Sequence, residues 1–207
     1  MKYSKLLILI ILILLVDQCL KIYIKTHFYY GQEVTLLGSW FRLHFIENEG
    51  MAFGMKFGDA SIAKLVLTLF RLVAVGFGFY YLNVMIKKGF KNATLICAAL
   101  ILAGAFGNLI DSIFYGKLFS ESGFCLAQWV PWGKGYANLF YGRVVDMLYF
   151  PLIEWTLPSS TPFIGAYTIR FFEPVFNIAD ASISIGVLTL LFFQKRLLTL
   201  PKEVKTD

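Results

Sequence analysis

Four stretches of the chain are almost entirely apolar, and polar residues gather in the segments between them. The apolar stretches cover about residues 6–24, 62–86, 93–115 and 175–193. Each is close to the roughly 20 apolar residues that a helix needs to cross the hydrocarbon core of a bilayer. The pattern therefore predicts an all-α membrane protein with four transmembrane helices in one domain over residues 1–207, and with longer loops at about 25–61 and 116–174.

The first apolar stretch has one feature of a signal peptide, because Lys2 and Lys5 precede it. It lacks a small-residue cleavage site, however, and Asp17 and Lys21 interrupt it. We therefore expect a retained helix. Because Asp17 and Lys21 are four residues apart, one helix face carries both, and we expect them to form a structural ion pair.

The two longer loops have patterns of their own. In the first, apolar and polar residues alternate over 41–46, which predicts a strand, and Glu-Asn-Glu-Gly at 47–50 then predicts a turn. The second holds three of the four tryptophans and five of the six prolines. Because tryptophan and tyrosine concentrate at the headgroup level of membranes, we expect this loop to pack on the membrane surface or to form a lid.

Basic residues are distributed unevenly along the chain. The two termini and the short link between the second and third stretches hold nine lysines and arginines against Glu203 and Asp207, whereas the longer loops are nearly balanced. Cytoplasmic segments of membrane proteins carry an excess of lysine and arginine. We therefore expect a multi-pass membrane protein with both termini cytoplasmic, and we interpret the net charge of +6 as a topology signal and not as a nucleic-acid-binding surface.

The composition agrees with a membrane protein and argues against a metalloenzyme. Hydrophobic residues make up 58% of the chain and charged residues 15%, against about 45–50% and about 25% in soluble domains. His27 and His44 lack the spacing of a metal site, and the three cysteines show no paired spacing. We expect neither a metal nor a cofactor.

Polar residues within the third and fourth apolar stretches form two similar pairs. Asn108 and Asp111 are three residues apart, and so are Asn177 and Asp180. If the third stretch runs outward and the fourth inward, both pairs lie near the outer edge of the membrane. Asp146 lies between them in the chain, at a similar expected depth. Ionisable groups at such positions are candidates for function by default.

Carboxyl groups that converge in a low dielectric can act as an acid–base pair. They do not both ionise easily, so they share one proton. The ionised member can then take a proton from water while the protonated member donates to a carbonyl oxygen, as peptide hydrolysis requires. Two function classes stay open on these grounds: an aspartyl endopeptidase, and a small proton-coupled carrier or channel component that uses the same carboxylates as a relay. Carriers often show internal repeats and a midplane site, and this sequence shows no repeat.

The motifs resemble those of the bacterial lipoprotein signal peptidases, the signal peptidase II family, along essentially the whole chain. Each motif is weak alone, but their order and their placement relative to the four apolar stretches are specific. The matching segments are Asp17-Gln-Cys-Leu-Lys21, Asn48-Glu-Gly50-Met-Ala52-Phe53-Gly54, Gly104-Ala-Phe-Gly107-Asn108-Leu-Ile-Asp111, Val144-Val145-Asp146 and Phe176-Asn177-Ile-Ala179-Asp180.

The resemblance implies a fold, an activity and a set of site residues. The fold is a four-helix membrane bundle with a small extracytoplasmic β-cradle and a lid-like interfacial segment. The activity is that of an aspartic endopeptidase, which cleaves diacylglyceryl-modified prolipoproteins just before the lipidated cysteine. The enzyme would lie among the lipids of the bacterial inner membrane with its active site at the extracytoplasmic face, and globomycin is the expected inhibitor. The catalytic aspartates match Asp146 and Asp180. The supporting polar residues match Asp17, Lys21, Asn48, Asn108, Asp111 and Asn177, and Gly50 completes the turn after Asn48.

One position departs from the family pattern. The family often has arginine directly after the aspartate of the third helix, where this chain has Ser112 after Asp111. That arginine would hold substrate carbonyl groups. Arg143, three residues before Asp146, is the candidate to replace it in binding substrate.

Overall fold

The computed structural model describes residues 2–38, 40–49, 60–151, 153–157, 168–171 and 174–198. Gly50 and the rest of the motif after Glu49, which the resemblance singles out, lie outside these residues.

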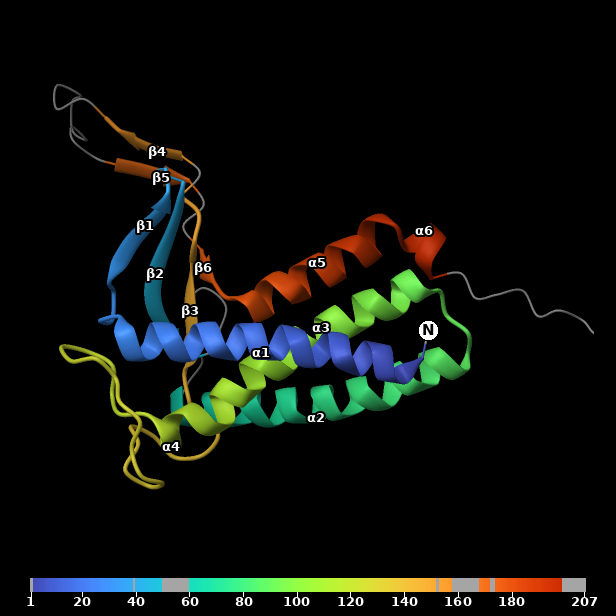
Figure 1. Ribbon diagram of the computed structural model, residues 1–207, viewed down its shortest axis with the longest axis horizontal. Helices are drawn as coiled ribbons and strands as arrows, with labels where there is room; N and C mark the ends of the chain where they lie inside the picture. The colour runs from blue at the N-terminus through green and yellow to red at the C-terminus, as the bar shows by residue number, and fades with distance from the viewer. Residues whose placement is uncertain are drawn as a thin grey trace, which may run out of the picture.

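Four apolar helices form the body of the molecule, and strands lie at one end of it (Figure 1). The helices are α1 (Tyr3–His27), α2 (Ala60–Lys87), α3 (Asn92–Ile110) and α5 (Ile178–Phe192). A π-helical turn (Asp111–Tyr115) and the short α4 (Gly116–Leu118) continue α3, and α6 (Gln194–Leu197) follows α5. Within the described part of the chain, three helices are long and apolar enough to cross a membrane, whereas α5 has only 15 residues.

The fourth helix is shorter than the predicted stretch at 175–193 because its first residues are not helical. Val175 and Phe176 form strand β6, and Asn177 is the N-cap of α5. The helix therefore begins where a side chain can satisfy its first backbone N–H groups.

Helix α3 lies at the centre of the bundle, in contact with α1, α2 and α5. Its glycines permit this close packing. A Cβ atom on Gly104 would lie 2.1 Å from the carbonyl oxygen of Ala179 on α5, and one on Gly107 would lie 2.8 Å from Oδ2 of Asp17 on α1. Any larger residue at either position would therefore push a neighbouring helix away.

The outward faces of the helices stay apolar. Ile8 on α1 and Val66, Phe70 and Val73 on α2 are among the side chains that are more than half exposed. So much apolar surface would be unfavourable in water. The bundle is therefore that of a membrane protein.

A four-stranded antiparallel sheet has the order β1-β2-β3-β6. Its strands are β1 (Glu33–Leu37), β2 (Phe41–Asn48), β3 (Val144–Tyr149) and β6 (Val175–Phe176). A separate two-stranded sheet pairs β4 (Ile153–Thr156) with β5 (Thr168–Phe171). Figure 1 shows these strands at one end of the bundle and the N-terminus with α6 at the other end.

Two sequence predictions about the loops need correction. The turn predicted at 47–50 begins too early, because β2 continues through Glu47 and Asn48, which pair with Val145 and Val144 of β3. The second long loop also contains three strands, β3, β4 and β5, that the apolar and polar pattern did not predict. One of these, β3, is buried along most of its length because it packs on α1 and on the π-helical turn.

Candidate active site

Strand pairing brings Asp146 and Asp180 together from distant parts of the chain. Asp146 lies in β3 and is only 2% exposed. Strand β6 pairs with the last residues of β3, Tyr149 with Val175 and Leu148 with Phe176. The chain therefore enters α5 directly beside β3, and Asp180 in the first turn of α5 lies near Asp146.

Asn177 connects the two aspartates. Its side-chain oxygen accepts a hydrogen bond of 2.9 Å from the backbone N–H of Asp180, which caps α5. Its side-chain nitrogen donates to Oδ1 of Asp146 at 2.6 Å and to the carbonyl oxygen of Val145 at 3.2 Å. One fully buried amide thus fixes Asp146 against the beginning of the helix that carries Asp180.

Asn108 holds the other aspartate. Its Nδ2 donates to Oδ1 of Asp180 at 2.7 Å, and its Oδ1 accepts from Asn177 at 3.2 Å. The same oxygen accepts a 2.8 Å hydrogen bond from the ammonium of Lys21. The amide of Asn108 therefore connects Asp180 to a charged cluster deeper in the bundle.

That charged cluster is larger than the single ion pair predicted from the sequence. Lys21 lies 2.9 Å from Asp17 and 2.8 Å from Asp111, and the three side chains are almost fully buried. Gln18 donates to Asp111 at 2.8 Å, and the backbone N–H of Ala179 donates to Asp17 at 2.9 Å. Asp111 is thus bonded to Lys21 and Gln18, and through Lys21 it is connected to Asn108.

The π-helical turn shapes the wall of the site. It begins at Asp111, and single π turns inside α-helices are frequent at functional sites. Gly142 packs against it, because a Cβ atom there would lie 2.1 Å from the carbonyl oxygen of Asp111. The N–H of Gly142 also donates to the carbonyl oxygen of Ser112 at 2.9 Å. This contact directs the chain from the second loop into β3, and so towards Asp146.

The surroundings of Asp146 favour its protonated form. Burial raises the pKa of Asp146 to about 7, and the charge of Asp180 acts in the same direction. Lys21 and hydrogen bonds from Asn177 and Asn48 lower the pKa and only partly offset the rise. The pair is therefore arranged for one shared proton near neutral pH.

Arg143, which we expected from the sequence to contact substrate, is engaged by residues other than Asp146 and Asp180. Its guanidinium bonds to Glu47 at 3.1 Å and to Glu121, and it lies over the ring of Tyr136. Glu47 also binds the buried Lys25. This second charged cluster connects α1, β2 and the second loop.

Arg71 is the cation that sequence reasoning missed. It lies on α2 and interacts electrostatically with Asp180, Asp111 and Asp146. The signal in the sequence is the spacing of Lys64, Thr68 and Arg71, which places three polar residues on one face of an otherwise apolar helix.

Among the described residues, no group of three or more histidine, cysteine, aspartate or glutamate side chains could hold a metal ion.

A bundle of apolar helices with two neighbouring carboxyl groups at one end defines a membrane protein with a candidate acid–base site. The family described as Signal peptidase (SPase) II matches residues 9–195. A lipoprotein signal peptidase from Porphyromonas gingivalis is 50% identical over 93% of this chain and 83% of its own length. Another, from Amoebophilus asiaticus, is 37% identical over 90% of this chain and 75% of its own length.

The chain belongs to the signal peptidase II family, and it is therefore a membrane protease. This finding favours the peptidase over the carrier hypothesis. Two solved structures described as bacterial membrane enzymes share the fold, each with a TM-score of 0.56. One is 21% identical over 98% of this chain and 96% of its own, and the other is 20% identical over 94% of each.

Proposed function

We propose that Asp146 and Asp180 are the catalytic pair of an aspartyl endopeptidase that releases signal peptides from diacylglyceryl-modified prolipoproteins, by cleavage just before the lipidated cysteine. The observation that carries this proposal is the position of Asn177, which bonds to Asp146 through its side-chain amide and to Asp180 through the N-cap of α5.

The two aspartates have different roles because their surroundings differ. Asp146 is buried, with a pKa raised to about 7, and holds the shared proton. Asp180 is partly exposed and is the base that takes a proton from water. The resulting hydroxide attacks the scissile carbonyl carbon, while Asp146 donates its proton to the carbonyl oxygen. When the intermediate collapses, the proton on Asp180 passes to the leaving nitrogen and the C–N bond breaks, while Asp146 takes back its proton.

Asn48 and Arg71 complete the site around the reacting bond. Asn48 hydrogen-bonds Asp146, and its amide can also donate to a substrate carbonyl group. Arg71 supplies positive charge opposite the carboxylates. A guanidinium has five N–H donors in a rigid plane, which suits it to hold main-chain carbonyl groups of an extended peptide. Arg71 is therefore our candidate for the substrate contact that we expected of Arg143 from the sequence.

The location of the site suits a lipid-anchored substrate. We infer that all four apolar helices span the membrane, that both termini are cytoplasmic, and that the site faces the opposite side. The basic residues of the α2–α3 link and of α6 support this orientation. The second loop is then a lid-like cover at the interface, in contact with lipid, and globomycin is the expected inhibitor.

Cleavage by purified protein tests the catalytic assignment. The full chain is incubated with a diacylglyceryl prolipoprotein, and the released peptide is measured by mass spectrometry. Asp146→Asn and Asp180→Asn should each slow release by about a hundredfold or more, because an amide cannot exchange the proton. Glu33→Gln, at an exposed carboxylate of β1, is the matched control and should cleave normally. Near-normal cleavage by either aspartate variant would refute the pair.

A further inference from the structure

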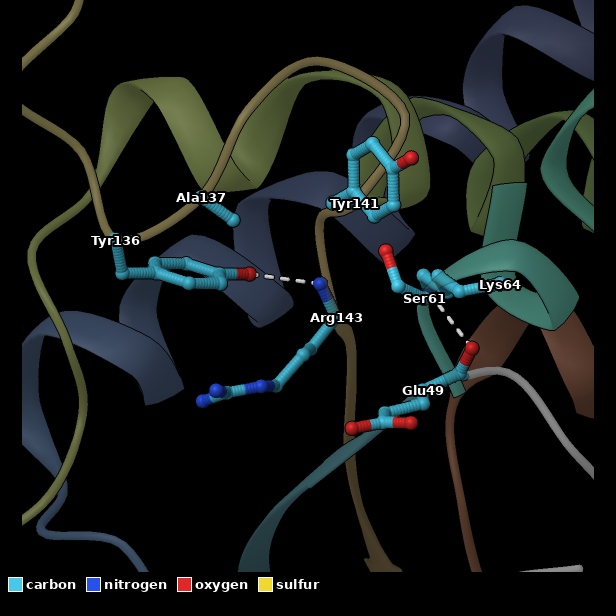
Figure 2. Close-up of a pocket in the computed structure, with 7 residues that line it drawn as sticks. All are labelled: Glu49, Ser61, Lys64, Tyr136, Ala137, Tyr141 and Arg143. Carbon is cyan, nitrogen blue, oxygen red and sulfur yellow. Dashed lines mark hydrogen bonds between the residues drawn. The ribbon is translucent and has the colours of Figure 1, made fainter. Parts of the chain in front are cut away.

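A cavity of about 250 Å³ opens between the beginning of α2 and the second loop (Figure 2). Its volume is several times the roughly 30 Å³ that one water molecule occupies in the liquid. Figure 2 shows Ser61 and Lys64 on one side of it, Tyr136 on the other and Tyr141 above Ser61. The polar lining residues are Glu49, Ser61, Lys64, Tyr136, Tyr141 and Arg143.

Lys64 is the unusual member of this lining. Its side chain is only 4% exposed, and its ammonium donates one hydrogen bond, of 2.7 Å, to the backbone carbonyl oxygen of Glu49. An ammonium has three donors, so two remain. No carboxylate among the described residues forms an ion pair with Lys64. A buried charge without a counter-ion is costly, and an anion in the cavity would remove that cost.

The other charges of the cavity leave it positive. Arg143 is already neutralised by Glu47 and Glu121. Arg71 and Arg143 repel the charge of Lys64. The carboxylates of Glu49 and Asp111 attract it but form no ion pair with it. Of the cations that line the cavity, Lys64 is therefore the one whose charge a ligand could still pair.

The walls of the cavity are held in place by hydrogen bonds. Thr68 on α2 donates to the carbonyl oxygen of Phe140 at 3.0 Å, and this bond fixes the helix against the second loop. The hydroxyl of Tyr136 accepts from the backbone N–H of Arg143 at 2.7 Å. The cavity is therefore formed before any ligand binds.

The cavity lies where the apolar surface of α2 begins. Ile62, Val66 and Phe70 project from the same turns of the helix and are each at least 60% exposed, as lipid-facing side chains are. Ser61 and Lys64 thus lie at the level where acyl chains end and phosphate groups begin. A buried ammonium at this level can donate charge-assisted hydrogen bonds to the phosphate of a lipid headgroup.

We propose that this cavity binds the phosphate group of a membrane phospholipid through Lys64, with the hydroxyl group of Tyr141 as a further donor. The site is separate from the paired aspartates, so it does not depend on the catalytic assignment. Because Glu49 follows Asn48 directly, a bound lipid would also steady the end of β2 that reaches Asp146.

Native mass spectrometry of the full-length protein in detergent tests this site. Three probes are titrated: dioleoyl phosphatidylglycerol, dioleoylglycerol with the same acyl chains but no phosphate, and inorganic phosphate. We expect the phospholipid to bind about tenfold or more tightly than dioleoylglycerol, as a charge-assisted hydrogen bond provides. Lys64→Gln should abolish this preference. Lys88→Gln, at an exposed lysine of the α2–α3 link, should keep it.

A second variant guards against misfolding of the first. Ser61→Asp places a negative charge at the mouth of the cavity, in the first turn of α2, where an acidic residue favours the helix. It should fold normally and lose the phospholipid preference. Equal retention of phospholipid by wild type and both variants would overturn the proposal. Binding of inorganic phosphate without a preference for the phospholipid would also overturn it, because the site would then serve a soluble anion.

Discussion

Asn108 on α3 and Asp180 on α5 are joined by a hydrogen bond of 2.7 Å from the Nδ2 atom of the amide to Oδ1 of the carboxylate. The bond crosses the interface between two helices that approach closely because Gly104 has no side chain. The position of a proposed catalytic carboxylate therefore depends on a packing contact one turn away along α3.

Gly104→Ala should separate α3 from α5. The new methyl group would lie 2.1 Å from the carbonyl oxygen of Ala179, and backbone atoms must shift to relieve the clash. Overpacking of this kind typically costs about 1–3 kcal/mol. We expect a lower Tm in detergent and slower cleavage per folded molecule, since Asp180 moves away from Asn108. Gly76→Ala on α2, which meets no atom within 4 Å, is the control and should lower neither quantity. Unchanged cleavage by Gly104→Ala would disprove the coupling.

The pH dependence of cleavage should report Asp146. Its pKa is raised to about 7, mainly by burial, and our mechanism uses it in the protonated form. The value of kcat/KM should therefore fall as the pH rises through about 7, because this quantity reports groups of the free enzyme. A profile that rises through pH 7 instead would exchange the roles of the two aspartates.

The same pKa predicts how stability depends on pH. In the unfolded chain an aspartate has a pKa of about 3.9, so Asp146 binds its proton more tightly when the protein is folded. Its contribution to stability is fully present below about pH 4 and is lost as the pH rises through about 7, with a slope of up to about 1.4 kcal/mol per pH unit. In the Asp146→Asn variant the Tm should therefore depend less on pH between about pH 4 and pH 7 than it does in the wild type.

Removal of Lys21 should destabilise the protein more than removal of Asp17. Lys21→Met leaves both Asp17 and Asp111 buried without their cation, and the loss of one partner from a buried ion pair costs about 3–5 kcal/mol. Asp17→Ala leaves Lys21 paired with Asp111, so its cost should be smaller. Thermal unfolding of both variants in the same detergent gives the order. The reverse order would show that the bond from Ala179 to Asp17, and not the ion pair, dominates.

The sequence predicted the helices well because a bilayer imposes a length and a composition that are visible along the chain. It also singled out the pairs Asn108 with Asp111 and Asn177 with Asp180, although Asn177 is the N-cap of α5 and not part of the helix. It did not predict that Asn177 would bond to Asp146, because that contact depends on the pairing of β6 with β3. Strand pairing between distant segments leaves little trace in a single sequence.

Arg71 and Arg143 show the same limit for charged residues. The sequence favoured Arg143 because it lies three positions from Asp146. Side chains an odd number of residues apart point to opposite faces of a strand, however, and Arg143 pairs with Glu47 and Glu121. Arg71 is distant in sequence, yet it interacts electrostatically with Asp146 and Asp180. Distance along the chain was a poor guide where tertiary packing decides which charges meet.

The orientation in the membrane can be tested with single cysteines in a variant without Cys19, Cys97 and Cys125. Cysteine in place of Lys134, an exposed residue of the second loop, should react with a membrane-impermeant thiol reagent in intact spheroplasts. Cysteine in place of Lys88 in the α2–α3 link should react only after lysis. The opposite pattern would place the aspartates on the cytoplasmic side and contradict our topology.

Asn48 is the last residue of β2 and is fixed there by its pairing with Val144, two residues before Asp146 in β3. This backbone pairing directs its amide to Asp146, to which it is hydrogen-bonded. The alternative is that Asn48 only caps the chain segment after β2, a common use of asparagine.

Asn48→Ala separates these two roles. If the amide also donates to the developing oxyanion, its loss should cost on the order of 3 kcal/mol, or roughly a hundredfold in kcat, with little change in Tm. The hydrogen bond from Asn48 lowers the pKa of Asp146, so without it the pKa rises and the fall in kcat/KM should move to higher pH. A residue that only caps its turn would leave that profile in place and lower the Tm. Asn138→Ala, at an exposed asparagine that binds Lys117, is the matched control and should change neither. An unstable Asn48→Ala enzyme with a normal rate and an unshifted pH profile would end the case for Asn48 in catalysis.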